Sequence, residues 1–396
     1  MSGFSLARPT ILWTQVFGLA LVQGAIALMW VIYNLYLPKF LNQFGFPKEF
    51  VISILICESL LAIAMEPLMG GMSDRTQRWL GTKFPLIALG VVLASALFIA
   101  LPAIVIFGNP MGALRWLLPI ALVAWALAMT VFRSPALSLL GQYAFASQLP
   151  QAASVLTLMG ALAGALGAFA NQVILNLGPA ITFATGSLVL LGAAAVLRLV
   201  TQQSTSSDNR LSQSTQQLSW KKLLLIFGAG VGISLGFTIV MRSLLSPATP
   251  SDHTKLMLTT FTIVHLLSVL PAGFVAVRLG NARSMLLGLL SVVGILLLMA
   301  IAYQNPIAIG LAALFGIAWG FVANGVIPFA LSLVPPNKAG LGTGMFFSGG
   351  ALAASIFGAM LSRFGALAPG LGIGLAILTF IVAGLCIWMS LQLSQA

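Results

Sequence analysis

Two ionisable side chains lie where a proton could be carried through a long apolar run. Glu58 and His265 each fall near the middle of such a run. Ionisable groups at that depth of a bilayer are costly and mark functional sites. A medium of low dielectric constant favours the neutral form of a carboxyl, so that Glu58 can hold a proton and release it when water or a cation arrives. We therefore expect Glu58 to couple transport to a proton or cation, unless it is permanently protonated, or paired with an arginine, and only bridges helices.

His265 is the second coupling candidate, because an imidazole titrates near neutrality. The sequence leaves open a simpler role as a hydrogen-bonding contact between helices. An internal repeat with an offset of 203 residues maps His265 onto position 62, one helical turn from Glu58. The two side chains are therefore expected to face similar regions in the two halves of the molecule.

Amide and aromatic side chains supply a second group of candidates, for binding a solute. Gln23, Trp30 and Asn34 are spaced seven and four residues apart, which places them on one helical face. Trp319 and Asn324 lie together on a later run. Amides hydrogen-bond to hydroxyls and aromatic rings stack on pyranose faces, so these residues suit a sugar cavity, although many membrane tryptophans are interfacial anchors.

The composition indicates which structural elements hold these candidate residues in place. Of 396 residues, 60% are hydrophobic and 6% charged, which excludes a water-soluble fold. A membrane helix needs about 20 apolar residues. Twelve runs of about that length are separated by charge, proline, glycine and asparagine, at 11–37, 47–71, 84–107, 114–140, 152–176, 179–200, 221–246, 255–278, 283–303, 307–334, 341–362 and 367–391.

A polar linker divides the twelve runs into two groups of six. Residues 201–219 are rich in Ser, Thr and Gln, as in flexible linkers. The segment from Gly70 to Arg75 matches that from Gly273 to Arg278, with Val277 in place of Asp74. Repeats of this kind are typical of transporters. We expect an all-α integral membrane protein with 12 transmembrane helices in two pseudo-symmetric six-helix bundles, at 1–200 and 220–396, joined by a cytoplasmic linker at 201–219.

The net charge of +12 indicates how the chain is oriented in the membrane. With the N-terminus inside, eleven of the eighteen basic residues fall on the cytoplasmic side and five outside, which favours cytoplasmic termini in a plasma (inner) membrane. The other two lie within runs. Arg133, in the inner half of its run, must find a carboxylate such as Glu58, carbonyls, water, a substrate, or headgroups reached by snorkelling. Arg242 lies near the outer end of its run, where we expect snorkelling.

A family resemblance rests on the segments 70–76 (GGMSDRT) and 81–85 (GTKFP). They resemble the loop motif of the major facilitator superfamily, in the variant of the glycoside-pentoside-hexuronide and sucrose transporters. Thr82 and Phe84 replace arginines of that variant. The resemblance implies the major facilitator fold and a cytoplasmic gate made of Glu66, Gly70, Asp74, Arg75, Arg78, Lys83, Gly273, Arg278 and Arg283.

The gate motif also has a physical logic of its own. Small residues such as Gly70 allow two helices to approach closely. Asp74 can accept hydrogen bonds or face the positive N-terminus of another helix, and the basic residues favour the cytoplasmic side. In the resembled superfamily this cluster latches the two halves together. The alternative is a signal for topology alone.

These observations predict a secondary active transporter that moves a small solute, a sugar or glycoside in the first place, by alternating access with proton or cation coupling. The alternatives are an exporter of lipophilic or drug-like compounds and a non-transporting assembly or pigment-delivery factor on the same fold. The sequence has no phosphate-binding loop and no metal-spaced His and Cys set, so we expect no enzyme, cofactor or metal site. The expected partners are the solute, the ion and the lipid bilayer, without nucleic acid, and the expected state is a monomer.

Overall fold

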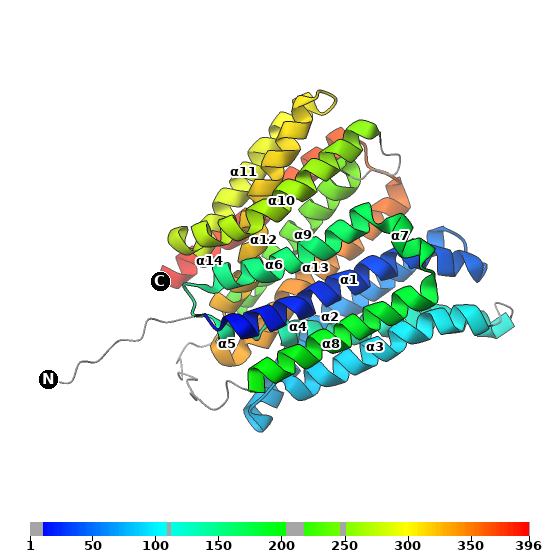
Figure 1. Ribbon diagram of the computed structural model, residues 1–396. Coiled ribbons are helices and arrows are strands. Elements are labelled where there is room, and N and C mark those ends of the chain that lie inside the picture. The colour runs from blue at the N-terminus through cyan, green and yellow to red at the C-terminus, as the bar shows by residue number, and fades with distance from the viewer. Residues whose placement is uncertain (1–10, 109–111, 203–217, 246–250, 396) are drawn as a thin grey trace.

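The protein is described by a computed structural model over residues 11–108, 112–202, 218–245 and 251–395, and within these ranges it is built of helices without a strand. Most of the predicted linker, 203–217, lies outside the described residues. The helices run side by side along one common direction (Figure 1). Twelve helical stretches of the described chain are long and apolar enough to cross a membrane. The prediction of an all-α membrane protein with twelve spans is therefore confirmed.

The first half of the chain contributes α1 (Trp13–Gln43), α2 (Glu49–Leu80), α3 (Phe84–Phe107), the 3-10 turn η1 (Gly112–Trp116), α4 (Leu117–Leu137), α5 (Leu140–Tyr143), α6 (Leu149–Phe169), α7 (Asn171–Asn176) and α8 (Pro179–Gln202). The second half contributes α9 (Trp220–Val240), the π-helical turn η2 (Met241–Leu245), α10 (Asp252–Leu279), α11 (Asn281–Ala302), α12 (Ile307–Ser332), the 3-10 turn η3 (Pro336–Lys338), α13 (Ala339–Phe364) and α14 (Pro369–Gln395).

Helices are the expected solution for such apolar segments, because a helix satisfies its backbone hydrogen bonds internally where no water is available. Helices end at residues that do not favour the helical conformation, such as glycine. At the turn from α2 to α3, Gly81 adopts a left-handed conformation with φ of 73°, which a residue with a side chain rarely adopts. The predicted run 152–176 is not one helix, because the backbone leaves the helical conformation at Ala170, between α6 and α7.

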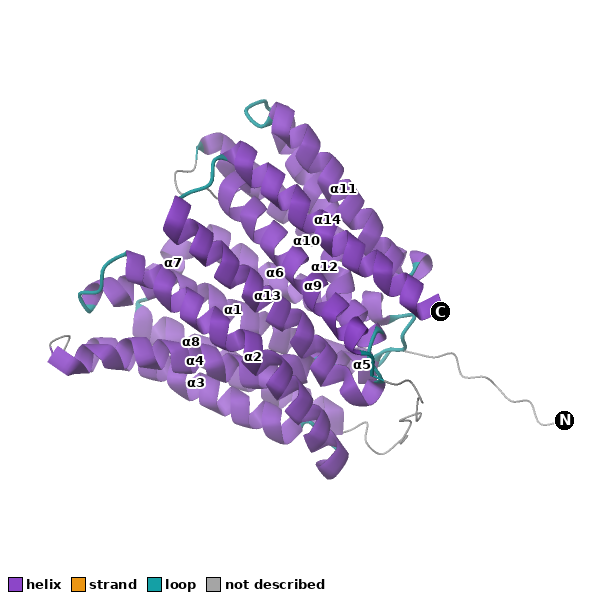
Figure 2. Ribbon diagram, turned by 180° about the vertical axis from the view of Figure 1, so that it is seen from behind, coloured by secondary structure: helices purple, strands orange, loops and turns teal. Residues whose placement is uncertain are grey.

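The hydrophobic core of the described residues has two parts. One joins buried residues of α1 to α8, with Leu331 and Ala339 added, and the other joins buried residues of α9 to α14. The spanning helices alternate in direction, so α1 begins and α14 ends on the same side as the turn from α2 to α3. We call this side the motif end, and the other side the opposite end. Both views show the start of α1 and the end of α14 at the motif end, where the helices lie closer together than at the opposite end (Figures 1 and 2).

The two halves meet through two main pairs of helices. α2 of the first half packs along α13 of the second, and α6 packs along α10. The pairs are pseudo-equivalent, since α2 and α10 occupy corresponding places in the two halves, as do α6 and α13. Between these contacts, α1 and α4 face α9 across the centre of the molecule, where the candidate site lies.

Candidate functional site

A central cavity of about 810 Å³ lies between the two halves. Its wall combines side chains from α1, α2 and α4 with side chains from α9, η2 and α13. It reaches the opposite end, because Pro38 of α1 and Ala366 and Leu367 of the connection between α13 and α14 line it. The side chains that line it nearest the motif end include Arg133 and Phe347. A volume of this size suits a small organic solute.

Glu58 of α2 lies in the cavity wall and is 5% exposed. Its carboxyl group accepts a hydrogen bond from the hydroxyl of Tyr33 on α1. The ring of Tyr33 is held in turn by stacking on Trp125 of α4, with 4.3 Å between ring centroids. Three helices therefore fix one carboxyl group at the edge of the cavity, beside the space that a solute would occupy.

Arg133 of α4 forms its ion pair with Glu66, not with Glu58 as the sequence had also allowed. Glu66 is fully buried and accepts a second hydrogen bond from the hydroxyl of Ser134. The separation of eight positions between the two glutamates places Glu66 about 12 Å further along α2, toward the motif end. The guanidinium also lies over the ring of Phe347, 4.5 Å from its centroid. Arg133 thus joins α2, α4 and α13 at the floor of the cavity.

Trp30 and Asn34 of α1 both line the cavity, which agrees with the shared helical face that their spacing predicts. Trp30 packs edge-on against Trp125 at 5.0 Å, and its indole N–H is buried without a hydrogen-bond partner. The side-chain amide N–H of Asn34 donates to the carbonyl of Trp30 over 2.8 Å. Thr130 of α4 lines the same wall.

Four other predicted residues lie outside the cavity lining. Gln23 faces α6, where a Cβ at Gly160 would lie 3.4 Å from its amide nitrogen. Trp319 stacks on Phe237 at 4.1 Å between centroids. A helical face is defined by spacing alone, and these faces turn toward neighbouring helices of their own half.

Asn324 and His265 are used to join α12 to α10. The amide of Asn324 donates to the carbonyl of Val269 over 2.7 Å. The Nδ1 atom of His265 lies 3.2 Å from the carbonyl oxygen of Gly316, and its ring stacks on Phe261. Since His265 is away from the cavity, it does not share the surroundings of Glu58 that the repeat predicted.

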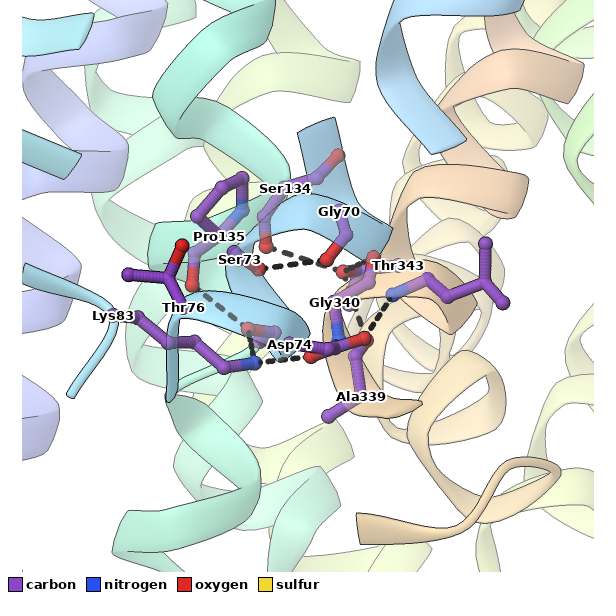
Figure 3. A network of polar contacts seen from close by, with 12 residues as sticks. Gly70, Ser73, Asp74, Thr76, Lys83, Ser134, Pro135, Ala339, Gly340 and Thr343 are labelled. Atoms are coloured by element: carbon purple, nitrogen blue, oxygen red, sulfur yellow. Dashed lines mark hydrogen bonds and ion pairs between the residues drawn. The ribbon is translucent and has the colours of Figure 1, made fainter. Parts of the chain in front are cut away.

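The motif end is closed by a polar network centred on Asp74 (Figure 3). The carboxylate of Asp74 accepts hydrogen bonds from the backbone N–H groups of Gly340 and Leu341, each over 2.9 Å. These groups belong to the first turn of α13, where backbone N–H groups have no partner within the helix and attract negative charge. Lys83 donates to the same carboxylate over 2.9 Å and to the hydroxyl of Ser138 over 2.7 Å. One carboxylate therefore links α2 to the connection before α3 and to the other half of the molecule.

Burial at this network lowers the pKa of the Lys83 amine, and the adjacent Asp74 carboxylate partly offsets that effect. The lysine side chain is 1% exposed, so water cannot replace the carboxylate as its partner. Lys83 and Asp74 therefore stabilise each other, because either charge alone would be buried without a partner of opposite charge.

Close backbone packing accompanies the charge network. A Cβ at Gly70 would fall onto the carbonyl of Gly340, and one at Gly344 onto the carbonyl of Glu66. The hydroxyl of Thr343 donates to the carbonyl of Ser134 over 3.1 Å (Figure 3). α13 is therefore seated against both α2 and α4 over several turns.

The second copy of the motif is built differently. Gly273 of α10 packs against Ser154 and the carbonyl of Pro150 on α6, as Gly70 packs against Gly340. Proline has no N–H to donate, and Val277 stands where an acceptor would be needed. The remaining basic residues of the predicted gate, Arg75, Arg78, Arg278 and Arg283, are exposed. The charged latch is thus present on one side of the interface, between α2 and α13.

Two residues at the site were not predicted from the sequence. Tyr33 does not line the cavity but donates to Glu58, and its place three residues after Trp30 puts it close to the same helical face. Arg242 was expected to snorkel, but it lines the cavity together with Ser234 and Thr238. The spacing of these three residues, four apart, could have shown the shared face.

Across residues 11–108, 112–202, 218–245 and 251–395, no three His, Cys, Asp or Glu side chains gather closely enough to hold a metal ion. The cysteines Cys57 and Cys386 are free.

In the described residues, twelve spanning helices form two packed halves with a cavity between them and a polar network that joins the halves at one end, which is the architecture of a membrane transporter. The family model of the Major Facilitator Superfamily matches residues 19–358. The chain belongs to this superfamily of integral, multi-pass membrane proteins.

Comparison with solved structures gives the same fold. The chain is similar to the proton:xylose symporter XylE bound to 6-bromo-6-deoxy-D-glucose, with 12% identity, a TM-score of 0.69, and coverage of 96% of this chain and 95% of that one. It is similar to the E. coli fucose:proton symporter FucP, with 12% identity, a TM-score of 0.63, and coverage of 95% and 98%. A bacterial homologue of the iron transporter ferroportin in the outward-facing state gives 14% identity, a TM-score of 0.73, and coverage of 98% and 100%. A search of curated proteins found no match.

Proposed function

We propose that the protein is a secondary transporter that carries a small hydroxylated solute through the central cavity by alternating access, driven by protons that bind at Glu58. The single observation that carries this proposal is a buried carboxyl group in the wall of a cavity that both halves line and that a latch closes at one end. Transport of this kind requires a solute site between two moving halves. It also requires an ionisable group that the solute pathway can reach.

A sugar or glycoside is the leading solute class. Trp30 offers a ring face, and Asn34 and Thr130 offer hydrogen-bonding groups in the same wall. Two of the structural neighbours are a proton:xylose symporter and a fucose:proton symporter, which fits this assignment at the level of the fold. We further propose that the motif end is cytoplasmic, in a plasma (inner) membrane, and that the protein works as a monomer whose halves 1–200 and 220–396 move as units about the linker.

Uptake of labelled sugars into proteoliposomes under an imposed pH gradient tests the proposal. Glu58→Gln keeps the side chain's shape but cannot release a proton, so proton-driven accumulation should fall to the level of protein-free liposomes. Counterflow exchange, which needs no net proton movement, should continue. The matched control is Glu49→Gln, at the exposed start of α2, which should leave both activities intact. Accumulation that survives in Glu58→Gln would remove Glu58 from the coupling role.

A second candidate function is favoured by the apolar part of the wall. Aliphatic and aromatic side chains make up much of the lining, among them Leu37, Val51, Ile52, Leu55, Phe347, Phe357, Leu361 and Leu367. Such a surface would also accept a lipophilic solute. The same proteoliposomes distinguish the two, because efflux of a hydrophobic dye without sugar uptake supports the lipophilic solute, and absence of any flux supports a non-transporting factor.

A further inference from the structure

One face of α9 and the turn that follows it presents polar side chains to the cavity. Ser234, Thr238 and Arg242 are each four residues apart and all three line the cavity. At Met241–Leu245 the helix widens into a π-helical turn, which includes Arg242. Turns of this type inside α-helices are frequently found at functional sites. The position of Arg242 is therefore set by a local departure from regular helix geometry, at the part of the cavity nearer the opposite end.

The cavity has more positive than negative groups. Arg133 and Arg242 line it from opposite halves, whereas Glu58 is its one carboxyl group among the residues the structure describes. Glu58 already accepts the hydrogen bond of Tyr33, and Glu66 is already paired with Arg133. The described ion pairs leave Arg242 without a carboxylate partner. Its side chain is exposed to the cavity mouth, so the charge remains available to a solute.

The hydrogen-bonding groups around the cavity include buried donors that have no acceptor. The Nε atom of Arg133 and the Nε1 atom of Trp30 are both buried donors without a partner. Arginine and tryptophan side chains can donate but cannot accept. A solute with acceptor oxygens would therefore suit the donors of this cavity, and an ionised acceptor would form the strongest bonds with a guanidinium.

We propose that the cavity binds an organic anion, whose carboxylate or phosphate group is held by Arg242 while its hydroxylated body lies toward Trp30. Arg242 is then the residue that determines specificity for charged over neutral solutes. This inference rests on the proposed function, since it assigns the class of solute that the transporter carries. Headgroup snorkelling of Arg242 is the competing role, and it predicts no dependence of solute binding on this side chain.

Binding of defined probes to the purified full-length protein in lipid nanodiscs tests the inference without requiring flux. The probes are D-gluconate for the carboxylate, D-glucose 6-phosphate for the phosphate, and D-glucose as the neutral reference, measured by isothermal titration calorimetry. The wild-type protein should bind at least one of the anions about tenfold or more tightly than glucose. That preference should weaken as salt is raised, because salt screens charge attraction. Comparison of the two anions identifies which group is recognised.

Substitutions at Arg242 give the decisive comparison. Arg242→Gln should weaken binding of the preferred anion by about tenfold and leave glucose binding unchanged, and Arg242→Lys should retain part of the affinity. The matched control is Arg115→Gln, because Arg115 lies at the opposite end, outside the cavity lining, against Phe46 and Trp116. It should bind all three probes as the wild type does.

Unchanged anion binding in Arg242→Gln would overturn the inference, and so would equal binding of glucose and both anions by the wild type. Failure of the inference is separable from failure of the proposed function. Proton-driven uptake of a neutral sugar without anion binding would refute the inference alone. Anion binding that depends on Arg242, without flux of any solute, would refute the proposed transport alone. Absence of both binding and flux would refute both.

Discussion

At the scale of single residues, the carboxyl groups of α2 have different partners and therefore different roles. Glu58 borders the cavity and accepts from a neutral phenol, Glu66 forms a buried ion pair below the cavity, and Asp74 faces a helix N-terminus at the motif end. A neutral partner leaves a carboxyl free to gain and lose a proton, whereas a fixed cation favours the charged form at all times. This difference is why we propose the coupling role for Glu58 and a structural role for Glu66.

Tyr33→Phe tests whether the phenol supports the coupling group. The substitution keeps the stacking on Trp125 but removes one hydrogen bond to Glu58. A single hydrogen bond of about 0.5 to 1.5 kcal/mol corresponds to a reduction of proton-driven uptake by about two- to tenfold, with counterflow retained. Tyr36→Phe is the control, since the hydroxyl of Tyr36 donates to the carbonyl of Ile174, away from the cavity. Equal losses in both variants would indicate a general effect on helix packing.

Glu66→Gln tests the buried pair. The substitution leaves the Arg133 guanidinium without its counter-charge, and breaking a buried pair in this way costs about 3 to 5 kcal/mol. The midpoint of thermal unfolding in detergent, followed by tryptophan fluorescence, should fall by several degrees. Asp252→Asn breaks the fully exposed pair with Lys255 and should leave the midpoint unchanged. An unchanged midpoint in Glu66→Gln would show that water in the cavity replaces the glutamate.

At the scale of elements, the two interfaces between the halves are related by pseudo-symmetry but differ in strength. The contact of α2 with α13 combines close glycine packing with the Asp74 latch. The contact of α10 with α6 retains the glycine, Gly273, but has Val277 and Pro150 where acceptor and donor would stand. Opening of the motif end is therefore opposed mainly at α13, which makes Asp74 the residue whose loss should favour the other conformation.

Asp74→Asn tests this asymmetry. An amide offers one acceptor oxygen in place of two charged ones, so at least one hydrogen bond to the first turn of α13 is lost or weakened. Charged hydrogen bonds of about 1.5 kcal/mol or more correspond to a shift of about tenfold toward the open motif end. The measurement is the rate at which N-ethylmaleimide modifies Thr343→Cys, a buried interface position, in a background that carries Cys57→Ser and Cys386→Ser.

The control for this experiment is Val277→Asn, which introduces the same amide at the corresponding place on α10. It should not change the rate at Thr343→Cys, because no latch exists there to be weakened. A rate that rises equally in both variants would show that any polar change at the interface loosens it. A rate that does not rise in Asp74→Asn would leave Asp74 as a signal for topology.

At the scale of the whole molecule, the sequence was sufficient for the number of spans and insufficient for the partners of their side chains. Twelve apolar runs predict twelve helices, because length and polarity decide which segments can cross a membrane. The partner of Arg133 could not be predicted, since it depends on how α2 and α4 are rotated against each other. The absence of Trp319 and Asn324 from the cavity lining could not be predicted either, since it depends on how α12 is rotated against α9 and α10. Asp74 was the exception, because the loop motif fixes its position at the end of α2.

Under the proposed alternating access, the joined motif end and the cavity that reaches the opposite end correspond to one of the two required states. If the halves rock as rigid units, opening one end must close the other. Gly70→Ala provides a wedge at the motif end, since the added Cβ meets the carbonyl of Gly340, and overpacking of this kind costs about 1 to 3 kcal/mol. Gly71→Ala is the matched control, because its Cβ would touch only Leu341 at 4.0 Å.

Distances between spin labels at the two ends measure this reciprocal motion. In the cysteine-free background, labels at the exposed positions Phe107 of α3 and Ile301 of α11 report on the opposite end, and labels at Trp79 of α2 and Leu279 of α10 report on the motif end. In Gly70→Ala the motif-end distance should lengthen while the opposite-end distance shortens, because the two halves pivot about the cavity between them. In Gly71→Ala both distances should match those of the parent protein. Lengthening at both ends would indicate separation of the halves rather than rocking, and a change confined to the motif end would indicate that α2 and α13 part locally while the cavity stays open.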